Sequence, residues 1–323
     1  MCQSETTESR RTTMQWALMT EPHLGMGYDT LLRMARFAEA AGLEAFARSD
    51  HYFAARVERP NATDAFATLA GLARETKAIE LVVLVSPITF RHPAVIAKTA
   101  ATIDEMSGGR LALGVGTGWM EAEHKKYGLP FPELGERFDR LEEALAYLHH
   151  AFGRSPGGFS GRHYSLENDE VFPRPKGLRL IVGGSGERRT PRLAGTYADE
   201  YNFFLGAKDD LADRMDWVRA AAQQAGRDPG AVMLSVMTQA ITGETQSDYE
   251  RNLARVAVAD PFRAGAAELE EHHRKSRFPI GTGPEVRARI AELEALGVGR
   301  IYLQHFGPYE EGLLEETFGV LRG

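Results

Sequence analysis

ELVVLVSPITFRHPAVIAKTAATIDEMSGGRLALGVG, residues 80–116, is the part of the chain in which its architecture is most readable. Two short apolar runs, Glu80–Ser86 and Leu111–Gly116, lie on either side of a longer amphipathic stretch. The apolar residues of LVVLV are continuous rather than alternating, which is typical of strands covered on both faces in a parallel sheet. These residues therefore predict a strand, a helix and a second strand parallel to the first.

The same alternation extends to both ends of the chain. Eight apolar runs are candidate strands: Gln15–Thr20, Leu43–Arg48, Glu80–Ser86, Leu111–Gly116, Arg179–Gly184, Glu200–Leu205, Val232–Ile241 and Arg300–His305. Between them, the stretch that begins near Gly135 has the clearest helical stripe of apolar residues. A count of eight favours an α/β protein with a single (β/α)8 TIM barrel over a doubly wound open sheet, which the alternation could also produce.

We expect one barrel domain over residues 14–323. The polar start, MCQSETTESRRTT at residues 1–13, is expected to be a disordered leader outside it. Two stretches inside the domain, Thr117–Leu134 and Gly153–Pro175, are longer than ordinary barrel loops. Long excursions in a compact barrel are usually binding loops or lids, so we expect insertion loops at the carboxyl-terminal face.

Composition restricts the classes of partner. Of the 323 residues, 43% are hydrophobic and 26% are charged, which is the balance of a globular chain. The net charge of −7, without a local run of Lys and Arg, disfavours nucleic acid as a partner. No segment has the apolar length of a membrane span, and one cysteine, Cys2, allows no internal disulfide. The chain is expected to be cytoplasmic, with a small molecule as its partner.

In a barrel, chemistry gathers where strands end, so the residues after each candidate strand are the first to inspect. The second strand ends in Asp50 and His51, and a histidine there could donate or accept the proton that accompanies hydride transfer. The alternative is a histidine that merely satisfies a buried backbone group. Ser86 and Thr89, at the end of the third strand, could hydrogen-bond the polar edge of a ring-shaped cofactor.

Two glycine-rich strand ends could leave room for a ligand. The fourth strand runs into GVGTG at residues 114–118, and alternate glycines let a flat ligand approach the backbone. The pattern is not a dinucleotide-binding fingerprint, because Trp119 and Met120 occupy the following turn. After the fifth strand, GGSG at residues 183–186 precedes a helix whose first N–H groups could hold a phosphate; a tight turn explains the same residues equally well.

The sequence disfavours a metal hydrolase and a serine nucleophile. His51, His92, His124 and His305 could in principle converge, but the chain has no strand-end His-x-His and no His-Glu-x-x-His motif. The GGSG stretch lacks the G-x-S-x-G spacing of a nucleophile elbow. We therefore predict no metal ligand.

Longer stretches resemble a known family, the luciferase-like monooxygenases, and within it the oxidoreductases that use the deazaflavin coenzyme F420. Four stretches carry the similarity: SDHYF at residues 49–53, the continuous segment 85–145, VGGSGERRTPRLAGTYADEYN at 182–202 and GVGRIYLQ at 297–304. The resemblance implies a luciferase-like TIM barrel with a flavin-like ring in its mouth. It also implies a homodimer, which is usual among the relatives.

The resemblance assigns residues to this cofactor. It places Asp50, His51, Val83, Leu84, Thr117, Gly118, Gly183, Gly184 and Ser185 next to the ring or its phosphate. Ser86, Trp119 and Gly186 are expected to bind the cofactor as well, from their positions at the same strand ends. His51 would be the catalytic proton donor or acceptor, with Asp50 beside it. Relatives have a non-prolyl cis peptide behind the ring, and the matching place here is around Val83 and Leu84.

One departure from the family bears on the substrate. Where the sugar-phosphate dehydrogenases of this branch carry a glutamate after Gly-Thr-Gly, this chain has Trp119. Together with Phe90 and Met120 in the substrate pocket, Trp119 indicates an apolar or aromatic substrate, although packing of the loop would explain the same side chains. The leading hypothesis is hydride exchange between coenzyme F420 and such a substrate; the alternatives are a reduced-FMN-dependent monooxygenase and a barrel that binds a flavin without catalysis.

Overall fold

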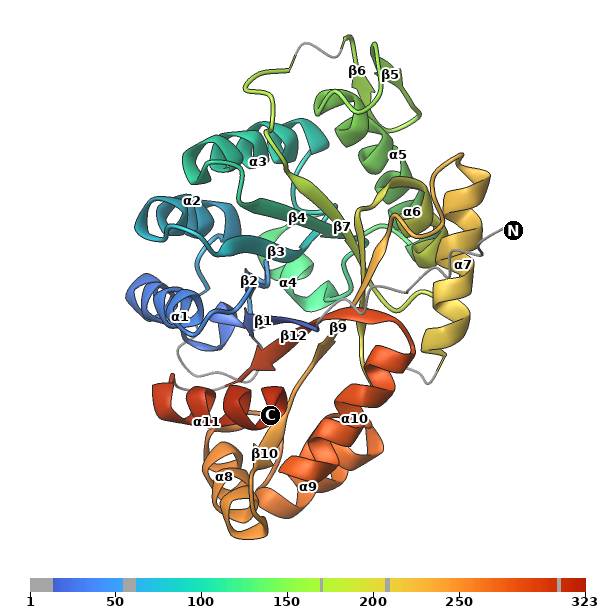
Figure 1. The fold of residues 1–323 in the computed structure, drawn as a ribbon. Helices are drawn as coiled ribbons and strands as arrows, with labels where there is room; N and C mark the ends of the chain where they lie inside the picture. Colours follow the sequence, from blue (N-terminus) through green and yellow to red (C-terminus); the bar gives the residue numbers. More distant parts are fainter. Residues whose placement is uncertain (1–13, 55–61, 169–170, 207–209, 307–308) are drawn as a thin grey trace, which may run out of the picture.

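The eight predicted strands form a closed barrel. A computed structural model of the chain describes residues 14–54, 62–168, 171–206, 210–306 and 309–323, so the expected leader at 1–13 lies outside the described residues. In the described part, eight parallel strands close in the order β1-β12-β9-β8-β7-β4-β3-β2 (Figure 1). They are β1 (Gln15–Thr20), β2 (Ala45–Arg48), β3 (Glu80–Pro87), β4 (Leu111–Gly116), β7 (Arg179–Gly183), β8 (Glu200–Phe204), β9 (Met233–Thr238) and β12 (Val298–His305). The prediction of a (β/α)8 barrel is confirmed.

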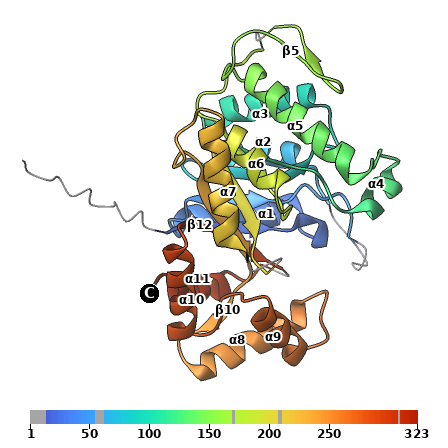
Figure 2. The ribbon, with the colours of Figure 1, turned by 90° about the vertical axis from the view of Figure 1, so that its right-hand side faces the viewer.

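Helices between the strands cover the outside of the barrel (Figure 2). They are α1 (Tyr28–Ala40), α2 (Ala65–Glu75), α3 (Pro93–Ser107), α5 (Leu134–Ala151), α6 (Arg189–Tyr197), α7 (Leu211–Gln224), α10 (Gly283–Ala295) and α11 (Glu311–Arg322). The predicted stripe after Gly135 is α5, which buries Phe138, Leu141, Leu145 and Leu148. A short 3-10 helix, Pro22–Leu24, follows β1.

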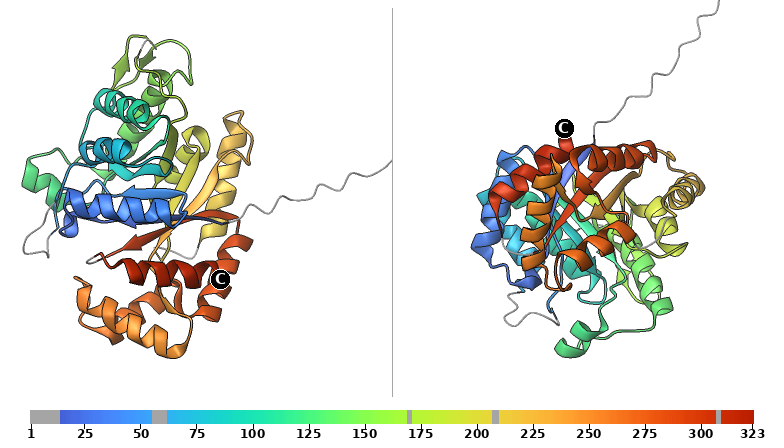
Figure 3. Two further views of the ribbon diagram at one scale, coloured as in Figure 1. Left: turned by 60° about the vertical axis from the view of Figure 1, so that its left-hand side comes forward. Right: turned by 90° about the horizontal axis from the view of Figure 1, so that it is seen from below.

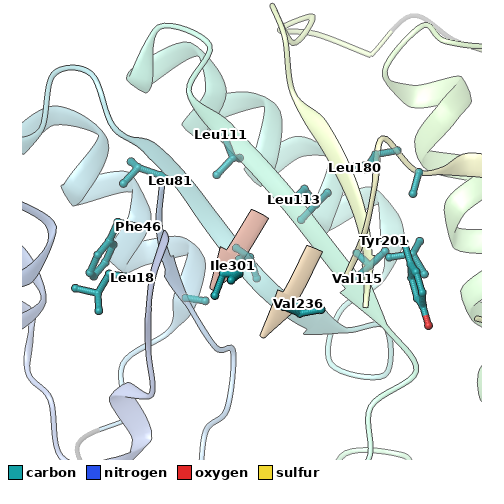
Figure 4. Close-up of a cluster of buried hydrophobic side chains, with 14 of the residues drawn as sticks. Leu18, Phe46, Leu81, Leu111, Leu113, Val115, Leu180, Tyr201, Val236 and Ile301 are labelled. Atoms are coloured by element: carbon teal, nitrogen blue, oxygen red, sulfur yellow. The ribbon is translucent and has the colours of Figure 1, made fainter. Parts of the chain in front are cut away.

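The barrel wall buries apolar side chains on both of its faces. Large apolar side chains point outward to the helices and form the main core (Figure 4), among them Leu18, Phe46, Leu81, Val83, Leu111, Leu113, Leu180 and Ile301. Four alanines, Ala17, Ala45, Ala47 and Ala112, lie in the interior together with Met19, Val82, Leu84, Ile181 and Tyr302. Alternation along each strand places successive residues on these two faces.

The two predicted excursions lie at different ends of the barrel. Residues 117–134 follow β4 and contain α4 (Glu121–Tyr127), so they stand at the carboxyl ends of the strands as expected. The described part of the second excursion, 153–168 and 171–175, contains a hairpin of β5 (Phe159–Ser160) and β6 (Ser165–Leu166). Because this hairpin connects the end of α5 to the start of β7, it lies at the amino ends of the strands and differs from the expected binding loop.

A further insertion follows β9. The run Val232–Ile241 was predicted as one strand, but β9 ends at Thr238 and Ile241 begins β10 (Ile241–Gly243), which pairs with β11 (Ile280–Thr282) outside the barrel. Two helices, α8 (Gln246–Ala259) and α9 (Ala266–Lys275), connect β10 to β11 and share a small apolar cluster with them. Figure 3 shows this orange segment beside the red carboxyl-terminal helix.

Candidate active site

His51 lies directly after β2, at the carboxyl ends of the barrel strands. Its Nδ1 is 3.0 Å from Oε1 of Glu123, a carboxylate that α4 supplies. The other carboxylate oxygen, Oε2, accepts the backbone N–H of Tyr52 at 3.1 Å. In the described part of the chain Nε2 of His51 has no hydrogen-bond partner, and it is not among the fully buried unpaired atoms. This nitrogen therefore remains for a ligand.

A second histidine and several carboxylates surround His51. Burial by itself lowers the pKa of His51, but the hydrogen bond to Glu123 and the charges of Glu21 and Asp50 outweigh it, so that the pKa is raised. His23 lies with its ring centroid 4.9 Å from that of His51, and its pKa is lowered, chiefly by burial. The pair thus favours a proton on His51 and a neutral His23.

Asp50 is fixed in a buried network on the other side of the strand end. Its Oδ2 accepts the hydroxyl of Ser86 at 2.7 Å, and the guanidinium of Arg91 binds both carboxylate oxygens. Arg91 also binds Asp64 and the hydroxyl of Tyr52. Burial raises the pKa of Asp50, against the lowering effect of Arg91. Consecutive residues of a strand point to opposite sides, so Asp50 and His51 face different partners. The carboxylate that binds His51 is therefore that of Glu123 and not that of Asp50.

The hydroxyls of Ser86 and Thr89 are used within the protein. Ser86 is fully buried against Asp50. Thr89 Oγ1 lies 2.7 Å from Nε2 of His124, whose Nδ1 lies 2.8 Å from the carbonyl oxygen of Met120. Because a carbonyl oxygen can only accept, Nδ1 of His124 carries the hydrogen and Thr89 donates to Nε2. The structure therefore does not present these two hydroxyls to a cofactor as the sequence suggested.

A bulge in β3 forms part of the barrel mouth. Its register with β4 shifts by one residue between Val83 and Ser86, and the peptide between Leu84 and Val85 is cis, one residue beyond the expected place. Leu84 lies in the barrel interior, and the side chain of Val85 is partly exposed beside it. The side chain of Val83 instead packs outward in the main core, so it cannot line the mouth as predicted.

The glycines at the strand ends accommodate this bulge. A Cβ at Gly183 would lie 2.7 Å from Cγ1 of Val85, and one at Gly116 would lie 3.0 Å from its Cγ2. At Gly114 a Cβ would come within 2.3 Å of the carbonyl oxygen of Val83. The sequence predicted that a ligand would approach the backbone of these glycines. The side chain of Val85 fills that space instead, so a ligand would contact Val85.

The glycine loop after β7 is open to solvent on its outer side. Gly184 and Ser185 are exposed, and α6 begins at Arg189 without a side-chain cap on its first turn. The guanidinium of Arg214, from α7, donates to the carbonyl oxygen of Gly186 at 2.6 Å. The loop is therefore fixed while the first N–H groups of α6 remain without a capping side chain, which suits a phosphate.

Aromatic side chains stand around the mouth. Trp119 is 71% exposed and packs edge-on against His51, with ring centroids 5.6 Å apart. Phe90 stacks on Tyr52 at 4.6 Å and is half-buried. Thr117, Gly118 and Met120 are also half-buried, in the turn between β4 and α4. Of the predicted substrate residues, Trp119 is thus the one that the structure brings to His51.

Sequence analysis did not identify several residues of the site. Glu123, Glu21 and His23 are all buried at the mouth, and Arg91 holds Asp50. Glu21 and His23 directly follow β1, and Glu123 lies in the excursion after β4. Strand ends and long loops are where a barrel site is expected, so these positions could have indicated the residues. The charge of Glu123 by itself gave no signal, since most acidic residues on an amphipathic helix face water.

Over the described ranges, no group of three or more His, Cys, Asp or Glu residues is arranged to hold a metal ion. None of the helices in the same ranges combines the length and the apolar character needed to cross a membrane.

The chain is similar to proteins described as flavin- or F420-dependent enzymes. The profile of one family, described as luciferase-like monooxygenase, matches residues 10–300. An F420-dependent glucose-6-phosphate dehydrogenase of Microbacterium testaceum is 30% identical over 307 residues, 89% of this chain and 90% of that protein. An FMNH2-dependent dimethylsulfone monooxygenase of Pseudomonas putida is 29% identical over 315 residues, covering 89% of this chain and 85% of its own.

Two further comparisons concern part of the chain and the fold. Pyrimidine monooxygenase RutA of Allorhizobium ampelinum is 34% identical over 190 residues, 56% of this chain, and the chain spans about half, 51%, of its length. The solved structure of an F420-dependent secondary alcohol dehydrogenase superposes with a TM-score of 0.77 at 20% identity, covering 96% of this chain and 99% of that one. At this identity the superposition shows the shared fold.

Proposed function

Because the chain belongs to the luciferase-like monooxygenase family, we propose that its barrel mouth binds coenzyme F420 and that a hydride is exchanged there with a small organic substrate. The relatives are named dehydrogenases and monooxygenases, so the chain is an enzyme of this family rather than a barrel that only binds. When bound, the deazaflavin supplies the carbon that accepts or releases the hydride. The protein supplies orientation and a path for the proton.

The observation that carries the proposal is the arrangement of His51. Its Nδ1 is held by a buried carboxylate, while Nε2 has no hydrogen-bond partner among the described residues. If the substrate is an alcohol, the hydride leaves its carbon and the hydroxyl proton passes to Nε2 of His51. In the reverse direction, protonated His51 returns that proton to the forming alkoxide. Asp50 contributes by holding Arg91 and the chain after β2, and we assign it a positioning role.

The residues present fit a ring with an anionic tail. The exposed loop of Gly184 and Ser185, after Gly183, meets the uncapped start of α6, where a phosphate would be bound by backbone N–H groups. The partly exposed side chain of Val85 would support the ring from the barrel side, and Thr117 and Gly118 would border it. Ser86 would act indirectly, through Asp50.

The aromatic side chains favour an apolar or aromatic substrate. Trp119 is largely exposed next to His51, where it can cover the substrate without offering a charge. Phe90 and Met120 would complete the pocket. The similarity to a glucose-6-phosphate dehydrogenase therefore supports the coenzyme and not the sugar phosphate, since this side of the mouth presents aromatic rings.

A second candidate is a monooxygenase that uses reduced FMN. A relative of nearly the same identity and coverage is named an FMNH2-dependent monooxygenase, which favours this reading as much as the first. The chemistry would then need molecular oxygen as oxidant, whereas hydride exchange does not. Under either candidate we propose a cytoplasmic homodimer, on the composition and the resemblance.

Titration of the purified chain with F420 and with FMN, read by fluorescence, tests the proposal. Tight binding of F420 with weak binding of FMN supports it; the opposite order supports the monooxygenase, and binding of neither overturns both. Single-turnover oxidation of the bound coenzyme should then slow by about 10²-fold or more in His51→Asn. His150→Asn, which alters a histidine at the opposite end of the barrel, is the control and should match the wild type.

A further inference from the structure

Helix α4 is attached to the segment that carries His51. Three of its residues contact the chain just after β2. Glu123 binds His51 and the N–H of Tyr52, the hydroxyl of Tyr127 donates to the carbonyl oxygen of Tyr52 at 3.1 Å, and Lys126 lies 4.0 Å from the ring centroid of Phe53. The helix therefore approaches this segment in a fixed orientation, and the carboxylate of Glu123 is delivered to one place.

The two oxygens of Glu123 have different partners with different requirements. The N–H of Tyr52 can only donate, so Oε2 must accept from it. Oε1, 3.0 Å from Nδ1 of His51, is likewise an acceptor while the carboxylate is ionised. Nδ1 of neutral His51 must then carry the hydrogen, which leaves the lone pair on Nε2.

We propose that Glu123 is the positioning residue of His51: its carboxylate fixes the Nδ1–H tautomer and aims Nε2 at the substrate. The catalytic use of Nε2 rests on the proposed function, whereas the tautomer does not. Glu123 is 1% exposed and belongs to the excursion after β4, so the loop that borders the substrate also sets the protonation geometry of the proton-transferring residue.

Among the described residues, the other charged groups that face His51 form no hydrogen bond with its ring. Oε1 of Glu21 accepts the side-chain amide of Gln304 at 2.6 Å, and its Oε2, which has no hydrogen-bond partner there, lies 3.4 Å from Nδ1 of His23. Asp50 is held by Arg91. His23 has a lowered pKa and adds no positive charge near neutrality. The hydrogen bond that decides the tautomer of His51 is therefore the one that its Nδ1–H donates to Glu123.

The sharpest test is Glu123→Gln, which keeps the shape of the side chain. A glutamine has one acceptor oxygen, and the fixed N–H of Tyr52 requires it. The amide NH2 would then face His51, so that Nδ1 must accept and the hydrogen must move to Nε2. Nitrogen-15 NMR of histidine-labelled protein, without coenzyme or substrate and at a pH above the raised pKa of His51, should show a hydrogen on Nδ1 alone in the wild type and on Nε2 alone in the variant. His51→Asn identifies the signal.

Glu121→Gln, two residues earlier on the exposed face of α4, is the matched control and should leave the tautomer unchanged. With coenzyme and substrate, Glu123→Gln should lower kcat by about 10²-fold or more, with little change in coenzyme affinity. An unprotonated Nδ1 in the wild type would overturn the proposal, even if the variant does not fold. Full activity after a switched tautomer would also overturn it. Failure of both coenzymes to bind, with the expected NMR, would remove the proposed function and leave the tautomer assignment standing.

Discussion

Two buried carboxylates at the mouth of the barrel have opposite surroundings. The guanidinium of Arg91 neutralises the charge of Asp50, and this ion pair holds the chain after β2 in place. Glu123 faces an imidazole and a backbone N–H, so its charge acts on His51. A carboxylate paired with arginine stabilises a structure, whereas one paired with histidine tunes a group that titrates near neutrality. The neighbouring positions of Asp50 and His51 in the sequence therefore conceal separate roles.

The raised pKa of His51 predicts the pH dependence of activity. In the direction that oxidises an alcohol, His51 must be neutral to accept the proton, so kcat/KM should fall as the pH drops through a value above the ordinary histidine pKa of about 6.5. Glu123→Gln removes the charge that favours the imidazolium and should move this inflection downward. Steady-state rates over a pH series measure both; a wild-type inflection below the ordinary value would contradict the assignment.

The pair of Asp50 and Arg91 predicts a large stability effect. Asp50→Asn leaves Arg91, a largely buried guanidinium, with Asp64 as its remaining charged partner, and should lower the free energy of unfolding by about 3 kcal/mol. Asp139→Asn, which breaks the exposed pair with Arg189, should change it little. Urea unfolding of the three proteins gives the comparison, and equal effects of the two substitutions would refute the structural role of Asp50.

Single-residue roles were only partly predictable. His51 was selected because a titratable residue at a strand end is visible in the sequence. The structure places it at the mouth beside Glu123, and its catalytic role stays a prediction. Glu123 was not identified, because nothing in the local pattern distinguishes a buried helical carboxylate from a solvated one. Ser86 and Thr89 were placed correctly along the chain, but their partners, Asp50 and His124, come from other elements, and such contacts depend on tertiary packing.

At the scale of elements, the ends of three strands interlock. The bulge in β3 turns Val85 toward the mouth, and the glycines of β4 and β7 make room for it. A bulge re-aims a side chain, and here Val85 has room because Gly116 and Gly183 lack a Cβ at the contact. The glycine pattern and the bulge are therefore one feature of the mouth, spread over β3, β4 and β7.

This interlocking predicts opposite outcomes for two glycine-to-alanine substitutions. In Gly114→Ala the new Cβ would meet the carbonyl oxygen of Val83, a backbone atom that cannot move alone, so we expect a loss of about 1–3 kcal/mol in unfolding free energy. Gly135→Ala, in α5 with open space around the position, should gain about 0.5–1 kcal/mol. Denaturant unfolding measures both, and a neutral Gly114→Ala would refute the close contact.

The elements themselves were largely predictable, with one instructive failure. Strands covered on both faces give continuous apolar runs, and all eight were located. The run Val232–Ile241 is continuous as well, yet Thr238 ends β9 and Ile241 starts β10. Hydrophobic period cannot tell one strand from two in succession, so the insertion of α8 and α9 remained hidden.

At the scale of the whole molecule, the two ends of the barrel carry different chemistry. The carboxyl ends of the strands hold the histidines and the open glycine loop, with polar atoms left for a ligand. The amino ends carry a closed ionic network: Arg300 binds Glu80 at 2.6 Å and lies 3.4 Å from Glu200, and Arg179 binds both carboxylates. The two arginines there balance the charges of the two glutamates, which suits a network that holds strands together rather than a site for a ligand.

This network predicts that one substitution at the floor of the barrel destabilises the entire fold. Arg300 contacts Gln15, Glu80, Glu200 and Tyr302, so it joins β12 to β1, β3 and β8. Arg300→Met leaves the buried carboxylate of Glu200 with Arg179 alone and should cost about 3–5 kcal/mol in one cooperative transition.

Removal of the excess negative charge should restore part of this loss. The double variant Arg300→Met/Glu200→Gln is expected to be more stable than Arg300→Met, because Arg179 then has one carboxylate to neutralise, that of Glu80, instead of two. Arg219→Met, which breaks an exposed pair with Asp216, serves as the control and should barely change the midpoint. Strictly additive losses in the double variant would show that Arg300 and Glu200 are not coupled, and that closure of the barrel depends on apolar packing instead.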